Sequence, residues 1–172
     1  MLLARIVDQS LPSNSQPQLE VTIRQATLDD IERFRPITSP WQLWHFSYRL
    51  HRDHICFITL LPDGEIVNYR WVSPELILGT YPIPLEPGDT YSGPAYTLPA
   101  YRRLGLNEAN FAECCRFLRE HSYKRILAIV ETDNVASLEF CQKVGYQEIG
   151  QVTFFTFFGW TIRRYTPKQH QR

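Results

Sequence analysis

The chain has 172 residues, a length that fits one domain and leaves no room for a second of full size. Hydrophobic residues make up 44% and charged residues 21%, which excludes global disorder and allows a packed core. Eighteen Lys and Arg balance eighteen Asp and Glu, which argues against a general binder of nucleic acid or acidic membranes. We find no apolar run as long as a membrane helix and no export signal, so we expect a cytoplasmic protein.

The chain contains four cysteines, Cys56, Cys114, Cys115 and Cys141. The adjacent pair Cys114 and Cys115 lacks the C-x-x-C spacing of a zinc site, and a chain without an export signal needs no disulfide framework. We therefore expect four free thiols packed in the core. His45, His51 and His54 are expected on different faces of a helix and its exit, so no metal site is predicted.

The first half of the chain predicts an N-terminal segment and linker over residues 1–18, because Ser, Pro, Gln and Asn crowd residues 10–18. One domain is expected over 19–166, followed by a polar tail over 167–172. The expected elements of this half are a strand at 19–24, a helix at 27–36, a helix capped by Ser39, and antiparallel strands at 55–61 and 65–72.

The second half predicts a further set of alternating strands and helices. They are a loop at 81–88, a strand at 91–98 bent at Gly93-Pro94, a helix at 103–121, a strand at 125–130, a helix at 135–144 and two strands within 147–165. The buried stripe of the longer helix is expected to include Phe111, Cys114, Cys115 and Leu118. The order of elements predicts a single α/β domain on a mixed sheet flanked by helices.

The segment TLPAYRRLGLN at 97–107 joins a strand end, a glycine-containing turn and a helix start. Such a junction exposes backbone N–H groups beside the positive end of a helix dipole, which suits phosphate. Gly105 allows close backbone approach, and Arg102 and Arg103 add positive charge. An ordinary helix start with surface arginines explains the same residues.

The segment ETDNVASLEFCQKVGY at 131–146 ends a strand and begins a helix at Asn134. The amide of an Asn in this place can bond an extended ligand chain. It can equally serve as an ordinary helix N-cap, with Gly145 closing the helix.

Together these segments resemble two motifs of the GNAT superfamily of N-acetyltransferases, over roughly residues 21–150. The P-x-Y/F-R-x-x-G-x-G/A motif is matched by Pro99, Tyr101, Arg102 and Gly105, with Asn107 at the last small-residue position. The N-x-x-A/S…G-F/Y motif is matched by Asn134, Ser137, Gly145 and Tyr146. The resemblance implies a mostly antiparallel sheet in which two neighbouring strands splay apart and form an acetyl-CoA cleft.

The resemblance also implies acetyl-CoA as co-substrate and an amine as acceptor. It places the pyrophosphate on the backbone amides of 103–107 and the pantetheine between the strands at 96–98 and 126–130, with Asn134 bonding the pantetheine arm. The cofactor-binding residues implied are Tyr96, Thr97, Leu98, Arg102, Arg103, Leu104, Gly105, Leu106, Asn107, Asn134 and Ser137.

Two departures from the family pattern concern Asn107 and Cys141. Asn107 replaces Gly or Ala, so its side chain is expected to loosen or partly fill the amide cradle. Cys141 stands where many members carry a tyrosine that protonates the departing thiolate. A thiol, with a reference pKa of ~8.5, can donate a proton, so Cys141 is a candidate acid. The alternative is a cysteine packed on the buried face of its helix.

A general base is needed to deprotonate the acceptor ammonium. Glu131, at the end of its strand, is the first candidate, and Asp89 and Glu86 are the others. A solvated loop charge is the more common explanation of each of these carboxylates. Tyr91 and Tyr96 can line the same cleft as hydrogen-bonding walls.

The leading hypothesis is an acetyl-CoA-dependent N-acetyltransferase in which a primary amine attacks the thioester directly in a ternary complex. The rivals are a non-catalytic acyl-CoA-binding or regulatory module and a scaffold protein. An aromatic run near the C-terminus is interpreted as a sheet packed on both faces, with a homodimer surface or an acceptor wall as alternatives. The run comprises Phe154, Phe155, Phe157, Phe158 and Trp160.

Overall fold

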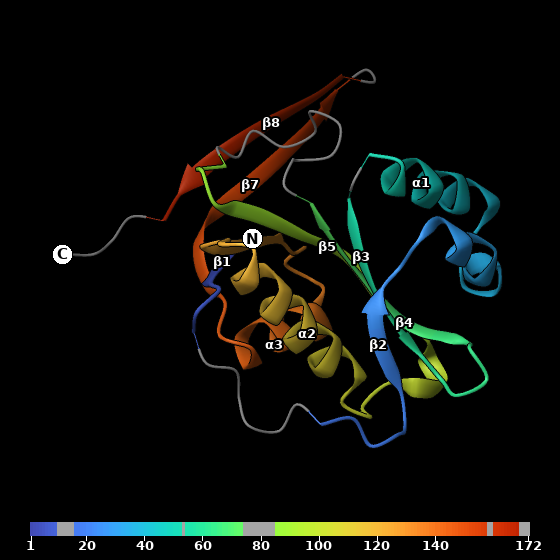
Figure 1. Ribbon diagram of the computed structural model, residues 1–172. Helices are drawn as coiled ribbons and strands as arrows, with labels where there is room; N and C mark the ends of the chain where they lie inside the picture. Colours follow the sequence, from blue (N-terminus) through green and yellow to red (C-terminus); the bar gives the residue numbers. More distant parts are fainter. Residues whose placement is uncertain (10–15, 53, 74–84, 158–159, 169–172) are drawn as a thin grey trace.

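The computed structural model describes residues 1–9, 16–52, 54–73, 85–157 and 160–168. These residues form one eight-stranded sheet in the order β2-β3-β4-β5-β6-β1-β7-β8 (Figure 1). Neighbouring strands run antiparallel, except β5 and β6, which run parallel. The predicted α/β class with a mostly antiparallel sheet is confirmed.

From β2 onward the elements follow the predicted order, with ends that differ by a few residues, except that an additional short 3-10 helix stands between β5 and α2. The strands are β1 (Leu2–Ile6), β2 (Thr22–Gln25), β3 (Ile55–Leu60), β4 (Ile66–Ser73), β5 (Asp89–Thr97), β6 (Arg125–Ile129), β7 (Gln147–Phe157) and β8 (Trp160–Pro167). The helices are η1 (Leu28–Ile37), α1 (Pro40–Leu50), η3 (Pro99–Tyr101), α2 (Leu106–Glu120) and α3 (Val135–Lys143), of which η1 and η3 are 3-10 helices. Of the predicted loop at 81–88, only residues 85–88 lie within the described part.

Helices cover both faces of the sheet. Side chains alternate along β3 and β4, so Phe57 and Val72 pack toward α2, whereas Ile58 and Trp71 pack toward η1 and α1. The stripe predicted on α2 is buried, and all four cysteines are buried free thiols, as predicted.

β1 lies inside the sheet, between β6 and β7, and pairs antiparallel with both. Leu2, Leu3 and Ala4 are buried there. This corrects the interpretation of residues 1–18 as a segment and linker outside the domain. A five-residue strand is too short for its periodicity to set it apart, and its partners lie 119 residues or more away in sequence, as Ile6 and Arg125 do.

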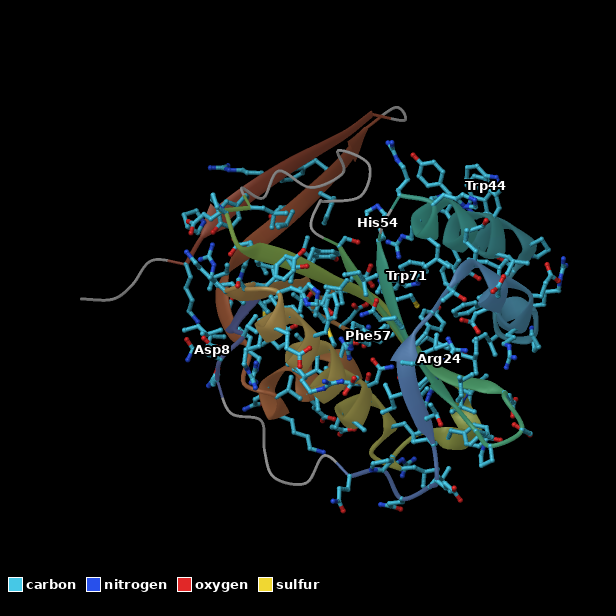
Figure 2. All side chains as sticks on the ribbon, in the orientation of Figure 1. Asp8, Arg24, Trp44, His54, Phe57 and Trp71 are labelled. Carbon is cyan, nitrogen blue, oxygen red and sulfur yellow. The ribbon has the colours of Figure 1, made fainter. Side chains whose placement is uncertain are left out.

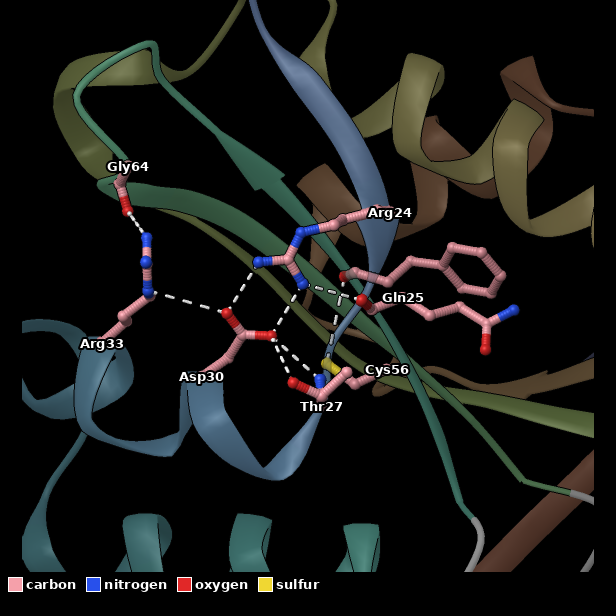
Figure 3. Close-up of polar contacts among 8 residues, drawn as sticks. Arg24, Gln25, Thr27, Asp30, Arg33, Cys56 and Gly64 are labelled. Atoms are coloured by element: carbon pink, nitrogen blue, oxygen red, sulfur yellow. Dashed lines mark hydrogen bonds and ion pairs between the residues drawn. The ribbon is translucent and has the colours of Figure 1, made fainter.

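A buried carboxylate ties η1 to the end of β2 (Figure 3). Both Asp30 oxygens accept hydrogen bonds from the Arg24 guanidinium at 2.7 Å, and Oδ2 also accepts from the Thr27 amide at 2.9 Å. Hydrogen bonding to Arg24 lowers the pKa of Asp30. This junction fixes the helical layer that leads into α1.

α1 begins at the predicted cap. The Ser39 side chain accepts from the Gln42 amide, and the Gln42 side chain accepts from the Ser39 amide, which completes a capping box. Trp44 lies on the outer side of α1 and is 56% exposed, whereas Trp71 is fully buried beneath the helix (Figure 2). The buried side of α1 carries Leu43, Phe46 and Arg49.

The long hairpin of β7 and β8 extends beyond the helical layers (Figure 1). Phe154 and Phe155 are 45% and 55% exposed. The expectation that the sheet is packed on both faces is therefore wrong at these two positions. The side chains of the other residues of that aromatic run lie outside the described set. Within the described ranges, no helix has the length and apolar character needed to span a membrane.

Candidate active site

The parallel strands β5 and β6 pair at one end only. Their register runs from Asp89–Arg125 to Tyr91–Leu127, and no pairing between them is recorded beyond that point in the described strands. β5 is irregular there, with a register shift against β4 and a cis peptide bond at Gly93-Pro94. The gap between the diverging strands contributes to a cavity of about 1160 Å³. This is the splayed pair that the resemblance implies.

Asp89 holds the closed end of this pair. Its carboxylate accepts from Arg125 Nε at 2.8 Å and Nη2 at 2.6 Å, and from the Glu86 amide at 2.9 Å. Burial alone would raise the pKa of Asp89, but these hydrogen bonds outweigh it, and the pKa is lowered. Asp89 does not line the cavity. The Glu86 carboxylate lies 3.1 Å from the Arg125 guanidinium, which also binds Asp89. Both base candidates are therefore held in an ion pair with Arg125.

Asn68 of β4 holds the open end of β5. Its Nδ2 donates to the Tyr96 carbonyl at 2.9 Å and to Thr97 Oγ1 at 2.8 Å. The Oδ1 atom of the same amide accepts from Thr59. These buried bonds keep the end of β5 with β4 while it diverges from β6, so Tyr96 and Thr97 line the cavity.

The loop after β5 delivers a helix N-terminus to the cavity. Arg103 and Gly105 have positive φ angles, 64° and 76°, and Gly105 is the N-cap of α2. Helix geometry leaves the amides of the first turn, at Leu106 and Asn107, without carbonyl partners within the helix. Arg102 and Arg103 both line the cavity and add positive charge beside these amides.

Residues 16–18 pack against this loop. The Gln18 amide donates to the Leu104 carbonyl at 3.0 Å, and a side chain at position 105 would begin 3.0 Å from the Gln16 carbonyl oxygen. Two features therefore favour glycine at position 105: the left-handed backbone conformation and the close approach of the Gln16 carbonyl.

The Arg70 side chain of β4 contacts the first turn of α2 from the sheet. Its Nη1 donates to Ser92 Oγ at 3.0 Å and its Nη2 to Asn107 Oδ1 at 2.8 Å. The guanidinium carbon lies 4.9 Å from the ring centroids of both Phe111 and Phe140. The side chain is buried, has no carboxylate partner among the described residues, and keeps its Nε without a hydrogen-bond partner.

Asn134 caps α3, because its Oδ1 accepts from the Ser137 amide at 3.1 Å. This bears out the helix-cap interpretation. Asn134 and Ser137 also line the cavity, and the Asn134 Oδ1 atom is already used in the cap.

Cys141 lines the cavity from α3 and is 6% exposed. Burial raises the pKa of its thiol to about 11, against an opposing effect of the Arg70 charge. Tyr146 also lines the cavity. Its buried hydroxyl has no hydrogen-bond partner among the residues that the structure describes, and burial raises its pKa well above the usual value. At neutral pH both groups are protonated.

The helical layer on the other face supplies Arg49, which lines the cavity together with Tyr91 and Tyr96. Its guanidinium lies 4.8 Å from the Trp71 ring centroid. Burial lowers the pKa of Arg49 to about 10. The cavity thus contains charged groups from both faces of the sheet.

The cavity brings together most of the residues predicted for cofactor binding. Leu98, Leu104 and the proposed base Glu131 do not line it, and Glu131 is exposed. The predicted residues that do line it are Tyr96, Thr97, Arg102, Arg103, Gly105, Leu106, Asn107, Asn134, Ser137 and Cys141.

Arg49 and Arg70 were missed by sequence reasoning. Neither lies in a motif, and an arginine within a helix or strand gives no sign that it is buried. The three spaced histidines have separate partners: His45 packs against Trp44, His51 Nδ1 lies 2.8 Å from the Ser47 carbonyl, and His54 Nδ1 lies 2.8 Å from Ser73 Oγ.

Several solved structures share this fold. An aminoglycoside N-acetyltransferase, AAC(6')-Iy in complex with CoA, has a TM-score of 0.62 and 21% identity, with 79% of this chain and 98% of that chain covered. The aminoglycoside antibiotic 6'-N-acetyltransferase AAC(6')-Ih from Acinetobacter baumannii has a TM-score of 0.61 and 14% identity, with 80% and 98% covered. A Trypanosoma brucei acetyltransferase has a TM-score of 0.58 and 16% identity, with 80% and 100% covered.

No curated protein matches the sequence. A model of the acetyltransferase (GNAT) family matches residues 21–146, which include η1, α1, the loop at Gly105 and the cap at Asn134. The match spans well over half of the 172 residues. This chain belongs to the acetyltransferase (GNAT) family.

Proposed function

We propose that this protein transfers an acetyl group from acetyl-CoA to a primary amine, by direct attack of the amine on the thioester in a ternary complex. The observation that carries the proposal is the cavity itself, which joins the N-terminus of α2 to the opening between β5 and β6. A cationic helix start at one part of a long cavity suits a ligand with phosphates attached to an extended arm.

In this proposal the pyrophosphate binds the first-turn amides of α2, at Leu106 and Asn107, with Arg102 and Arg103 beside it. The pantetheine arm lies between the diverging ends of β5 and β6, where its amides bond strand groups that the two strands do not use for each other. The Asn134 Nδ2 group donates to the same arm, while its oxygen remains the cap of α3.

The departing thiolate is proposed to meet two groups of the cavity wall. Cys141 is protonated at neutral pH and can donate a hydrogen bond or a proton to sulfur. Arg70, whose charge acts on Cys141, supplies a fixed cation where negative charge develops. Arg70 would thus stabilise the thiolate at the position where many family members protonate it with a tyrosine.

The acceptor ammonium is proposed to lose its proton to water before attack. Glu131 lies outside the cavity, and Asp89 and Glu86 are held by Arg125. The carboxylates that line the cavity, Glu108 and Glu139, come from α2 and α3, and Glu108 is paired with Lys143 at 2.7 Å. The rate at low amine concentration is then expected to rise with pH toward the pKa of the free amine.

A non-catalytic acyl-CoA-binding module is the second candidate, and the presence of Cys141 where many members carry tyrosine favours it. Calorimetric titration with acetyl-CoA tests the cavity in both proposals. Release of free CoA thiol across a panel of amines then separates them. Binding without thiol release from any amine would support the module, and no binding would contradict both.

A further inference from the structure

Arg49 is a buried cation that the proposed transfer does not use. It is 8% exposed, it lines the cavity, and its buried Nη1 atom has no hydrogen-bond partner among the described residues. Its guanidinium lies against the ring of Trp71, whose buried indole N–H also has no partner in the described part of the chain. Within the described residues, two neighbouring side chains therefore hold donors with no acceptor.

No carboxylate compensates this charge in the described part of the chain. Asp30, the buried carboxylate of the same helical layer, is paired with Arg24 at 2.7 Å and lies 3.7 Å from Arg33. The groups whose electrostatic effect reaches Arg49 are Cys56, Tyr69 and Tyr91, none of which is a carboxylate. Burying a cation and an N–H donor without partners costs free energy, which a bound anion would recover.

Arg49 also stands apart from the part of the cavity that suits phosphates. It comes from α1, on the face opposite α2, whereas Arg102, Arg103 and the first-turn amides lie in the loop and at the start of α2. Tyr91, which also lines the cavity, is close enough to act electrostatically on Arg49. A second anion-binding position in one cavity indicates that a second ligand brings a negative charge of its own.

We infer that the acceptor is a small primary amine that also carries a carboxylate, and that Arg49 binds this carboxylate. The inference rests on the proposed acetyl transfer and names its acceptor class. The planar guanidinium offers paired N–H donors that match the two oxygens of a carboxylate. A polycationic amine, such as an amino sugar with several ammonium groups, would instead place like charge against Arg49.

The test is thiol release from acetyl-CoA with matched acceptors. Glycine, leucine and phenylalanine are each compared with the corresponding amino acid amide and the corresponding decarboxylated amine, and one polycationic amino sugar is included. We expect kcat/KM for the carboxylate member to exceed that for its amide by about 10- to 100-fold in at least one set, as for loss of a charge-assisted hydrogen bond. Equal or better rates with the amides, neutral amines or amino sugar would overturn the inference and leave acetyl transfer standing.

Arg49→Met removes the charge and keeps an apolar stem over Trp71. It is expected to bring the ratio between carboxylate and amide close to one. The matched control is Arg52→Met, three residues on, where the arginine is exposed and lies outside the cavity. This control is expected to keep the wild-type ratio. A ratio unchanged by Arg49→Met would contradict the assignment of Arg49.

Two outcomes of these experiments need a different test of the inference. If Arg49→Met does not fold, the wild-type ratios alone decide the inference. If no amine releases thiol although acetyl-CoA binds, the proposed transfer fails. Calorimetry of the CoA-loaded protein with N-acetylphenylalanine and its amide then decides the inference: preference for the acid supports an anion site, and equal or absent binding overturns it.

Discussion

Arg70 Nη2 donates to Asn107 Oδ1 at 2.8 Å, which joins the centre of the sheet to the first turn of α2. Asn107 stands where the family motif has Gly or Ala, so the departure has a structural reason in this chain: it supplies an acceptor for a buried guanidinium. The side chain points to Arg70, and the backbone amide of Asn107 keeps its place in the helix N-terminus. The Asn107 side chain, which we expected to loosen or partly fill the amide cradle, instead bonds Arg70 of the sheet.

Asn107→Ala should lower the free energy of unfolding by about 1.5–3 kcal/mol, because a hydrogen bond to a buried charged group is lost. Urea unfolding at pH 7 measures this. Glu108→Ala is the matched control, since its exposed pair with Lys143 should contribute less than about 1 kcal/mol. Equal stability of Asn107→Ala and wild type would show that Arg70 does not depend on this bond.

Asn134 has two roles that substitution can separate. Asn134→Asp keeps the oxygen that caps α3 and removes the Nδ2 donor, so acetyl-CoA affinity should fall by about 1–2 kcal/mol with little change in stability. Asn134→Ala should lower both affinity and thermal stability. Calorimetry and thermal unfolding of the two variants measure the pair of effects. If the Asp variant bound acetyl-CoA as wild type does, Asn134 would be a cap alone.

Arg103→Ala should weaken acetyl-CoA binding, because Arg103 lines the cavity beside the first turn of α2. The loss should shrink as salt is raised, since exposed charges are screened within about 8 Å at physiological ionic strength. Arg116→Ala, on the outer side of α2 and paired with Glu113 and Glu120, is the control and should leave affinity unchanged. A loss equal in both variants would point to net charge and not to this loop.

Cys141 should react slowly with iodoacetamide in the native protein. With a pKa of about 11, the thiolate is about one part in a thousand of the thiol at pH 8, and the rate should rise about tenfold per pH unit from pH 7 to 9. Mass spectrometry of the alkylated chain measures this, with unfolded protein as the reference in which all four cysteines react. Bound acetyl-CoA should slow the reaction further. Rapid modification at pH 7 would contradict a protonated, buried thiol.

Asp89→Asn should destabilise the protein by about 2 kcal/mol at pH 7, because the buried carboxylate is bonded to Arg125 and to the Glu86 amide. The pKa of Asp89 is lowered in the folded state, so its contribution is present above the unfolded value of about 3.9. It is lost as pH falls through the lower folded value. The difference in stability between wild type and variant should therefore be constant from pH 5 to 7 and shrink below pH 4. A difference that persists unchanged at pH 2 would contradict this pairing.

The sequence predicted what local signals encode. The capping box at Ser39, the buried stripe of α2 and the two family motifs depend on residues within a few positions of each other, and each appears as expected. Most of the motif residues also line one cavity, because the strand end, the turn and the helix start are contiguous in the chain.

What the sequence missed depends on contacts between distant segments. β1 is a strand only because β6 and β7 flank it, and Arg49 and Arg70 meet the cavity only once α1 and β4 are packed. The sequence predicts Glu131 as the first candidate base because it ends a strand beside the expected thioester, yet the residue is exposed and outside the cavity. The position of a residue at the end of a strand does not determine whether its side chain faces the cavity or the solvent.

A crystal structure of the protein with acetyl-CoA would show where the co-substrate binds. We expect the pyrophosphate on the amides of Leu106 and Asn107, the pantetheine between the diverging ends of β5 and β6, and the thioester sulfur near Cys141. Acetyl-CoA bound outside this cavity, or its pyrophosphate bound away from the first turn of α2, would contradict the proposed function.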